Sequence, residues 1–173
     1  MSEYMEQVIT MEIIIREFEP KDLPEMITIW NSVVEEANAF PQSNTLDMHS
    51  AAQFFGSQTF TGVAEADDKH DIVGLYILHP NNVGRCSHIC NASYAVEKMA
   101  RGYGVGRMLV KHSLAKGKER GFRIMQFNAV TSANTAAQRV YEDLDFTPLG
   151  TIPNGFLLPD GTYDDIRLYY KTL

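Results

Sequence analysis

The hexapeptide at residues 101–106, Arg-Gly-Tyr-Gly-Val-Gly, constrains the fold of this chain more than any other feature. A strand-like run from Ile89 to Val96 precedes it, and a helix-like stretch follows it. Glycine permits positive φ and a close approach of the backbone to a ligand. The first N–H groups of a helix have no internal acceptor, and the helix dipole adds positive potential there. The pattern therefore predicts a strand, a glycine turn and a helix that bind the phosphates of a cofactor.

The spacing of the glycines argues against two other phosphate-binding loops. The chain has no Gly-Lys-Ser or Gly-Lys-Thr, so the turn is not a nucleotide-hydrolysing loop of the Walker type. The spacing is Gly-x-Gly-x-Gly rather than Gly-x-Gly-x-x-Gly, and the turn lies in the middle of the chain, which argues against a dinucleotide fold. A glycine-rich turn that binds no ligand is the alternative that the hexapeptide alone leaves open.

Composition narrows the class of protein. The chain has 173 residues, 45% of them hydrophobic, and a formal net charge of −7. A chain of this length suits one domain with a substantial core, so we expect a single domain over residues 1–173. Nucleic acids and anionic membranes attract basic surfaces, so the net charge argues against both as partners. Without a membrane-length apolar run or a secretory pattern at Met1–Met11, we expect a cytoplasmic protein.

Two cysteines flank a histidine in the middle of the chain. Cys86 and Cys90 are the only cysteines, and His88 lies between them. If the three residues share one strand, their side chains point to the same face. Their spacing nevertheless matches neither a zinc site nor a disulfide framework. We therefore predict no metal site, and reduced cysteines that suit the cytoplasm.

Hydrophobic periodicity and turn signals predict the order of the elements. The expected strands span residues 12–18, 60–66, 72–79, 88–96, 124–130, 146–152 and 163–173, and the expected helices span residues 23–34, 47–55, 104–120 and 134–144. An acidic turn at residues 65–71 predicts an antiparallel hairpin. The alternation of strands and helices in the second half implies crossovers and parallel pairing there. The predicted class is α/β with a mixed (α+β) sheet.

Two motifs in this order resemble those of a known superfamily. Arg101-x-x-Gly104-x-Gly106 resembles the acetyl-CoA pyrophosphate loop of the GNAT N-acetyltransferases. Residues 134–141, Asn-Thr-Ala-Ala-Gln-Arg-Val-Tyr, resemble the Asn-x-x-Ala-x-x-x-Tyr helix of the same superfamily, which usually ends in Gly-Phe. Here the helix ends in Asp145-Phe146. Aspartate tolerates left-handed φ better than most residues, so we expect function to survive, although the form of this turn stays open.

The resemblance covers essentially the whole chain and implies a fold and a reaction. The fold is that of the GNAT acyl-CoA N-acyltransferases, a central mixed β-sheet of about seven strands flanked by about four helices. The implied activity is transfer of an acetyl group from acetyl-CoA to a primary amine, by direct attack in a ternary complex. Acetyl-CoA is the implied co-substrate, and no metal is implied.

The resemblance also implies which residues bind acetyl-CoA. Its pyrophosphate would contact the glycine turn, through Arg101, Gly102, Tyr103, Gly104, Val105, Gly106 and Arg107. Its pantetheine arm would pair with the backbone of Tyr94, Ala95 and Val96, unless these residues pair with the strand at residues 124–130. Asn134 would bond the arm, cap its own helix, or do both.

Two side chains are candidates for proton transfer. Tyr141 stands at the general-acid position of the superfamily, where it would protonate the departing sulfur; the alternative is a core aromatic residue. An alkyl ammonium has a pKa near 10.4, so the acceptor amine also benefits from a base. Superfamily members often carry a carboxylate on the strand before the turn, but this strand has none. His88 is therefore the candidate base, and the alternative is a structural histidine.

The acceptor site is the least constrained part of the sequence. In this fold the acceptor usually sits between the first two helices and the last strands, which makes Trp30, Asn38, Phe40 and Asn91 candidate contacts. The chain is similar in form to the branch that acetylates amino acids and related small amines, such as phosphinothricin. A peptide or protein N-acetyltransferase and a non-catalytic acyl-CoA-binding module are the alternatives. The sequence also leaves open whether the protein is a homodimer.

Overall fold

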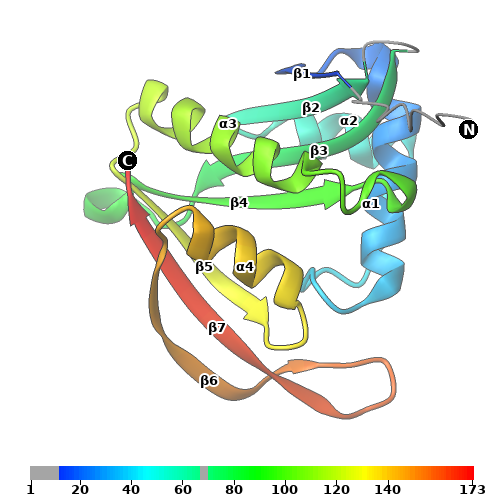
Figure 1. The fold of residues 1–173 in the computed structure, drawn as a ribbon. Helices are drawn as coiled ribbons and strands as arrows, with labels where there is room; N and C mark the ends of the chain where they lie inside the picture. Colours follow the sequence, from blue (N-terminus) through cyan, green and yellow to red (C-terminus); the bar gives the residue numbers. More distant parts are fainter. Residues whose placement is uncertain (1–11, 67–69) are drawn as a thin grey trace, which may run out of the picture.

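The computed structural model describes residues 12–66 and 70–173, which form a mixed α/β structure around one seven-stranded sheet (Figure 1). The strands are β1 (Ile13–Glu17), β2 (Phe60–Ala66), β3 (Asp71–Pro80), β4 (Ile89–Val96), β5 (Ile124–Thr131), β6 (Thr147–Leu157) and β7 (Tyr163–Thr172). The helices are α1 (Leu23–Glu36), α2 (Met48–Gly56), α3 (Val105–Glu119) and α4 (Thr135–Asp143), with short 3-10 turns η1 (Pro20–Asp22), η2 (Gly84–Cys86) and η3 (Lys98–Ala100). The predicted fold class is confirmed. Within the described ranges, no helix has the length and hydropathy of a membrane span.

Helices cover both faces of the sheet, and each face has its own core. One cluster joins α1 and α2 to β3, with Trp30 and Ile77 among its members. The other joins α3 and α4 to the opposite face, with Leu109 and Tyr141 among its members. Because β3 is buried on both faces, its sequence is a nearly continuous apolar run rather than an alternating one.

The sheet order is β1-β2-β3-β4-β5-β7-β6, so the last strand lies between β5 and β6. The hairpin predicted at residues 65–71 is confirmed, because β2 and β3 pair antiparallel. In the second half, only β4 and β5 pair in parallel. The α4 crossover carries the chain past one strand position, and β7 returns into that position antiparallel to both neighbours. The parallel pairing that the alternation predicted is therefore interrupted by β7.

Two local predictions differ from the structure. Cys86 lies in η2, outside β4, so Cys86, His88 and Cys90 do not share a strand face; Cys86 is exposed and Cys90 is buried. In residues 12–66 and 70–173, no group of three His, Cys, Asp or Glu side chains is arranged to hold a metal ion. The strand expected at residues 146–152 extends to Leu157 as β6, and Asn154 lies within it at φ 54°, where the register with β7 shifts.

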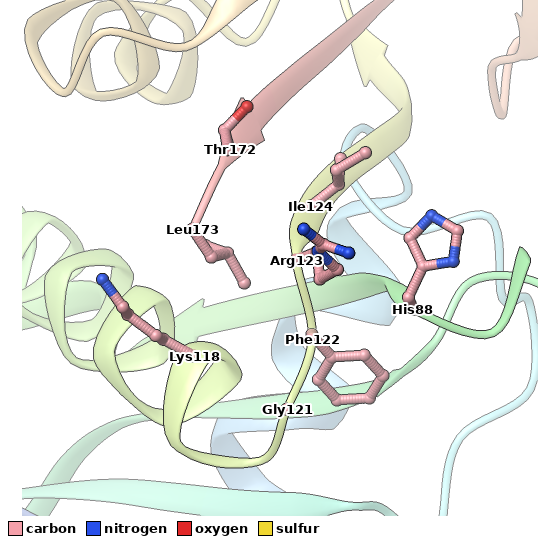
Figure 2. A pocket seen from close by; sticks show the side chains of 8 residues that line it. All are labelled: His88, Lys118, Gly121, Phe122, Arg123, Ile124, Thr172 and Leu173. Carbon is pink, nitrogen blue, oxygen red and sulfur yellow. The ribbon is translucent and has the colours of Figure 1, made fainter.

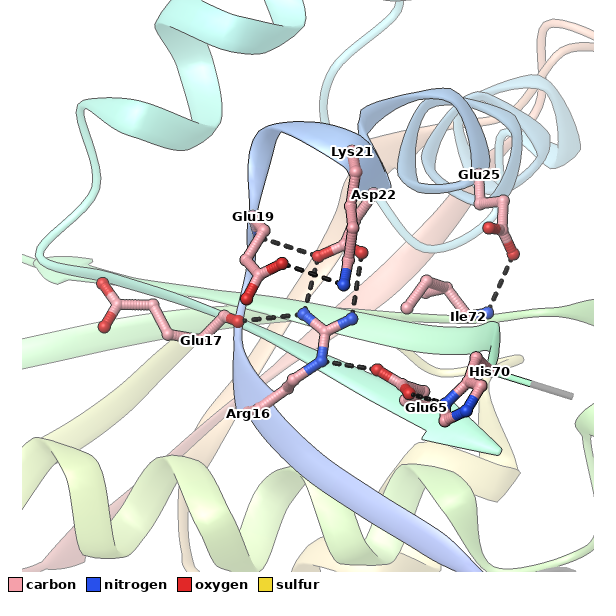
Figure 3. A network of polar contacts seen from close by, with 9 residues as sticks. All are labelled: Arg16, Glu17, Glu19, Lys21, Asp22, Glu25, Glu65, His70 and Ile72. Atoms are coloured by element: carbon pink, nitrogen blue, oxygen red, sulfur yellow. Dashed lines mark hydrogen bonds and ion pairs between the residues drawn. The ribbon is translucent and has the colours of Figure 1, made fainter. Parts of the chain in front are cut away.

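Arg16 on β1 ties the start of α1 to the sheet (Figure 3). Its guanidinium donates to both carboxylate oxygens of Asp22, at 2.7 and 2.9 Å, and to Glu65 on β2. Asp22 is almost fully buried and also accepts the N–H of Glu19 at 2.7 Å. Burial alone would raise the pKa of Asp22, but the bonds from Arg16 and Glu19 lower it on balance. This network fixes where α1 starts and therefore where its far end lies.

Candidate active site

β4 and β5 separate soon after they begin. Their pairing consists of Ile89 with Ile124 and Cys90 with Met125. Beyond that point β5 stays paired with β7 along its other edge, while β4 and β5 diverge (Figure 1). A split therefore opens in the middle of the sheet, with β4 as one wall and β5 as the other.

The hydrogen bonds at the two ends of β4 show which backbone groups of this strand face β3 and which face the split. Glu97 donates its N–H to the Val73 carbonyl at 2.9 Å, and the Ile89 carbonyl accepts the N–H of Asn81 at 2.8 Å. Because antiparallel neighbours bond at every second residue, the odd-numbered residues of β4 bond to β3. The even-numbered residues therefore turn their N–H and carbonyl groups towards the split.

This geometry sorts the three residues predicted to contact the pantetheine arm. Tyr94 and Val96 present their backbone to the split, where neither has a partner on β5. Ala95 faces the other way, towards Leu75 on β3. The Val96 carbonyl accepts a bond from Nε of Arg101 at 3.2 Å. The backbone of Tyr94 is therefore the part of β4 most open to an added strand.

The glycine turn presents backbone N–H groups to solvent. Gly102 and Gly104 have φ of 87° and 84°, and a Cβ at either position would meet no atom within 4 Å. The first helical bond runs from Met108 N–H to the Gly104 carbonyl at 3.1 Å. In the described part of the chain, the N–H groups from Gly102 to Arg107 have no acceptor. Unpaired N–H groups at the start of a helix are the arrangement that binding of an anion requires.

Both arginines of the turn are paired with carboxylates. The two terminal nitrogens of Arg101 each lie 2.9 Å from an oxygen of Glu36 at the end of α1. Arg107 lies 2.6 Å from Asp143 at the end of α4. The arginines therefore hold the turn against α1 and α4, and the groups left open to an anion are the backbone N–H groups.

Tyr141 lies in an aromatic cluster under α4. Its ring centroid is 4.5 Å from that of Phe127 on β5, and its side chain is nearly buried. Among the described residues no side chain or backbone group bonds its hydroxyl, and the oxygen is not sealed from solvent. Burial raises the pKa of Tyr141 above its usual value, and the nearby Tyr169 raises it further by a smaller amount. The phenol is therefore held in its protonated, proton-donating form.

Both ends of α4 are capped by the residues of the second motif. Asn134 is the N-cap, and its side chain accepts the N–H of Ala137 at 3.2 Å. At the other end, Phe146 donates its N–H to the Tyr141 carbonyl at 2.9 Å, and Asp145 has φ of 58°. This is the Schellman arrangement, with aspartate in the usual glycine position. The turn that the sequence left open is therefore intact.

His88 comes just before β4, whereas the glycine turn follows β4; Figure 2 shows His88 among the residues that line a pocket. It is exposed, and its carbonyl accepts the N–H of Arg123 at 2.9 Å. It borders a shallow pocket of about 760 Å³ that is lined by His88, Lys118, Gly121, Phe122, Arg123, Ile124, Thr172 and Leu173. The paired residues Ile89 and Cys90 separate it from the split. The structure therefore does not bring His88 together with Tyr141.

The predicted acceptor contacts are only partly at the surface. Trp30 and Phe40 are 1% and 6% exposed, and their rings stack at 4.4 Å inside the core beneath α1 and α2. They pack the fold instead of lining a cleft. Asn38 is exposed, and its carbonyl accepts a bond from the Thr131 hydroxyl at 2.6 Å. Asn91 is half-buried beside the start of the split.

Two features beside Asn91 escaped the sequence analysis. His79 is its direct partner across the β3–β4 ladder. The side chains of Asn81 and Asn128 exchange hydrogen bonds, at 2.6 and 3.3 Å, and so connect the end of β3 to β5. Residues 79 and 91 become neighbours only through the register of the two strands. The sequence between the strands expected at residues 72–79 and 88–96 gives no signal for that register.

Comparison with known proteins agrees with this geometry. A model of the acetyltransferase (GNAT) family matches residues 24–146. The N-acetyltransferase aca1 of Schizosaccharomyces pombe is 36% identical over 107 residues, covering 61% of this chain but only 51%, about half, of that relative. A GCN5-related N-acetyltransferase from Kribbella flavida has a TM-score of 0.85 and 28% identity, covering 93% of this chain and 98% of its own. A GNAT superfamily phosphinothricin acetyltransferase from Sinorhizobium meliloti, solved in complex with acetyl-CoA, has a TM-score of 0.86 and 19% identity. The match covers 93% of this chain and 88% of that chain.

Proposed function

Because this chain belongs to the GNAT acetyltransferase family, we propose that it transfers the acetyl group of acetyl-CoA to the primary amine of a small molecule. The observation that carries the proposal is the split between β4 and β5. It leaves the N–H and carbonyl of Tyr94 without a partner on β5, and the turn that follows β4 leads to a helix start whose N–H groups have no acceptor in the described part of the chain.

The wall of the split and the glycine turn suit the two ends of acetyl-CoA. N–H groups from Gly102 to Arg107 would bind the diphosphate, as helix starts bind anions elsewhere. The N–H and carbonyl of Tyr94 would pair with the amides of the pantetheine arm in the manner of an added strand. Asn134, already an N-cap, lies at the start of the neighbouring helix and would contact the same arm. The Sinorhizobium meliloti neighbour, which has the same fold, binds acetyl-CoA.

Tyr141 would act as the general acid of the reaction. Its hydroxyl is not sealed from solvent, and its raised pKa keeps the proton on the oxygen at neutral pH. A thiol has an ordinary pKa near 8.5, so a phenol nearby needs only to supply one proton as the thioester sulfur leaves. In direct attack by the amine no nucleophile of the protein has to become acetylated.

Two other functions stay as alternatives. A peptide or protein substrate would use the same split, and the neighbour from Sinorhizobium meliloti, a phosphinothricin acetyltransferase, is the reason to put a small amine first. A non-catalytic acyl-CoA-binding module would need the glycine turn but would have no use for a proton donor at position 141.

An acetyl-CoA thiol-release assay over a panel of amino acids, polyamines and peptides tests the proposal. We expect CoA release that depends on one class of small primary amine. Release with peptides alone would favour the protein-directed alternative. Acetyl-CoA binding in calorimetry without release for any amine would favour the binding module, and absence of binding would contradict the proposal.

A further inference from the structure

We propose that His79 on β3 is the base that takes the proton from the acceptor amine, directly or through a water held by Asn91. This inference rests on the proposed acetyl transfer and adds a residue that the sequence motifs do not identify. It replaces His88, which lies beyond the paired residues at the other end of β4.

The packing of the helices determines the side from which the amine must come. Tyr141, α3 and α4 cover one face of the sheet. On the other face, the core beneath α1 and α2 contains residues of β2, β3 and β4 but none of the described residues of β5, β6 or β7. This face of the split is therefore the one that helices leave accessible, and the acceptor would enter there.

His79 lies on the same face of the sheet as α1 and α2. Ile77 and Ala95 belong to the core beneath α1 and α2. Strand residues two or four positions apart point the same way, so His79 and Asn91 point to this side too. The two are direct partners across the ladder, and Asn91 is the first residue of β4 after its pairing with β5 ends. His79 is therefore one strand away from the place where the split begins.

Among the described side chains of β3, β4 and β5 on this side of the sheet, His79 is the one that can accept a proton at neutral pH. On this side of β3, β4 and β5, the described polar residues near the split are His79 and the neutral side chains Asn91, Ser93, Gln126 and Asn128. Amides and hydroxyls do not accept a proton at neutral pH, whereas a neutral imidazole does. No ion pair among the described residues involves His79, and its ladder neighbour Asn91 is uncharged.

A hydrogen bond sets the tautomer of the His79 ring. Nδ1 of His79 lies 3.0 Å from the Pro80 carbonyl, and a carbonyl oxygen can only accept a hydrogen bond. In the neutral ring, Nδ1 therefore carries the proton, and Nε2 keeps the lone pair that a base needs. The side-chain oxygen Oδ1 of Asn91 accepts the N–H of Ala92 at 2.8 Å. The side-chain NH₂ group of Asn91 is therefore left to orient a water or the amine.

The proton balance is then complete within the chain. Nε2 of His79 takes one proton from the ammonium group, and the freed nitrogen lone pair forms the new C–N bond. As the C–S bond breaks, Tyr141 gives its proton to the sulfur and regains one from the nitrogen, which ends as an amide. His79 returns its proton to solvent, so the net reaction releases one proton.

The test compares His79→Gln with the matched variant His88→Gln, using two kinds of acceptor. Alkylamines such as putrescine and glycinamide must lose a proton, whereas hydroxylamine, a weakly basic amine, is already neutral at pH 7. For the best alkylamine, we expect His79→Gln to lower kcat/KM for thiol release by about 100-fold, the usual effect of a general base. Hydroxylamine should react about equally well with His79→Gln and the unaltered protein. His88→Gln should match the unaltered protein with both acceptors.

Two further measurements separate a base from a structural residue. Acetyl-CoA affinity and circular dichroism should be the same in His79→Gln and the unaltered protein. Nitrogen NMR of the unaltered protein should show the neutral His79 ring protonated on Nδ1.

An unchanged alkylamine rate in His79→Gln, an equal loss with both acceptors, or the opposite tautomer would overturn the role of His79 while leaving acetyl transfer in place. If the unaltered protein releases no thiol with any amine, the proposed function is overturned, and this inference with it.

Discussion

The two ends of β4 differ although they belong to one strand. At its first residues, Ile89 and Cys90 pair with β5. The Cys90 sulfur packs against Gly117 of α3, where a Cβ at position 117 would lie 3.6 Å from it. At its last residues, Tyr94 and Val96 face a split and lead into the glycine turn. The difference arises because β5 diverges from β4 after Met125 while it stays paired with β7 along its other edge. The candidate site is thus made by a missing strand partner as much as by side chains.

The sharpest expected contrast at the closed end is in thiol reactivity. Burial raises the pKa of Cys90 to about 12, whereas Cys86 is exposed in η2. Because the thiolate is the reactive form, we expect Cys90 to react with iodoacetamide at pH 8 at least about 1000-fold more slowly than Cys86. Peptide mass spectrometry after timed labelling measures both rates. Comparable labelling of the two residues would mean that this end of β4 opens in solution.

At the open end, Gly104→Val should weaken acetyl-CoA binding by about 1000-fold. The side chain would occupy the space in front of the N–H groups and remove about two charge-assisted hydrogen bonds, worth about 4 kcal/mol together. Isothermal calorimetry with acetyl-CoA measures the affinity.

Gly121→Val is the matched control for this change. Gly121 follows α3 at its other end, with φ of 86° and no atom within 4 Å of a built Cβ. Both variants should lose about 1–2 kcal/mol of unfolding free energy because valine is strained at positive φ. Only Gly104→Val should lose affinity, and equal losses in both would contradict the anion site.

Tyr141→Phe should lower turnover by about 100-fold and leave acetyl-CoA affinity nearly unchanged, because it removes a proton donor but keeps the ring in its aromatic cluster. Because burial raises the pKa of Tyr141, ionisation of this residue should not reduce turnover of the unaltered protein up to pH 9. Steady-state thiol release gives both results. Tyr169→Phe, in the same cluster, is the control and should keep its turnover; full activity in Tyr141→Phe would exclude the acid role.

The smallest expected effect is at the end of α4. Asp145→Gly should raise the unfolding free energy by about 0.5–1 kcal/mol, because glycine adopts φ of 58° without the steric cost that aspartate carries. Urea denaturation measures the change. Turnover should stay the same, since the hydrogen bond from Phe146 to Tyr141 that ends the helix does not involve the side chain at position 145. A destabilised variant would mean that aspartate makes a compensating contact.

Local features were well predicted from the sequence. The glycine turn, the helix at Tyr141 and the order of elements follow from periodicity and from residues with special backbone preferences. The errors concern partners that lie far apart in the chain. Arg101 was expected to meet phosphate, but its partner in the structure is Glu36. Trp30 was expected in a cleft, but an aromatic residue on an amphipathic helix has the same spacing in a core. Only strand register makes His79 the neighbour of Asn91.

The place of β7 between β5 and β6 has a consequence for biosynthesis. β5 gains its second neighbour only when residues 163–172 have emerged from the ribosome, long after the glycine turn has been made. Until then, the N–H and carbonyl groups of β5 that later pair with β7 have no strand partner. A ribosome that stalls within the β6 segment would therefore release a chain that is competent to start folding but prone to pair with the wrong strand.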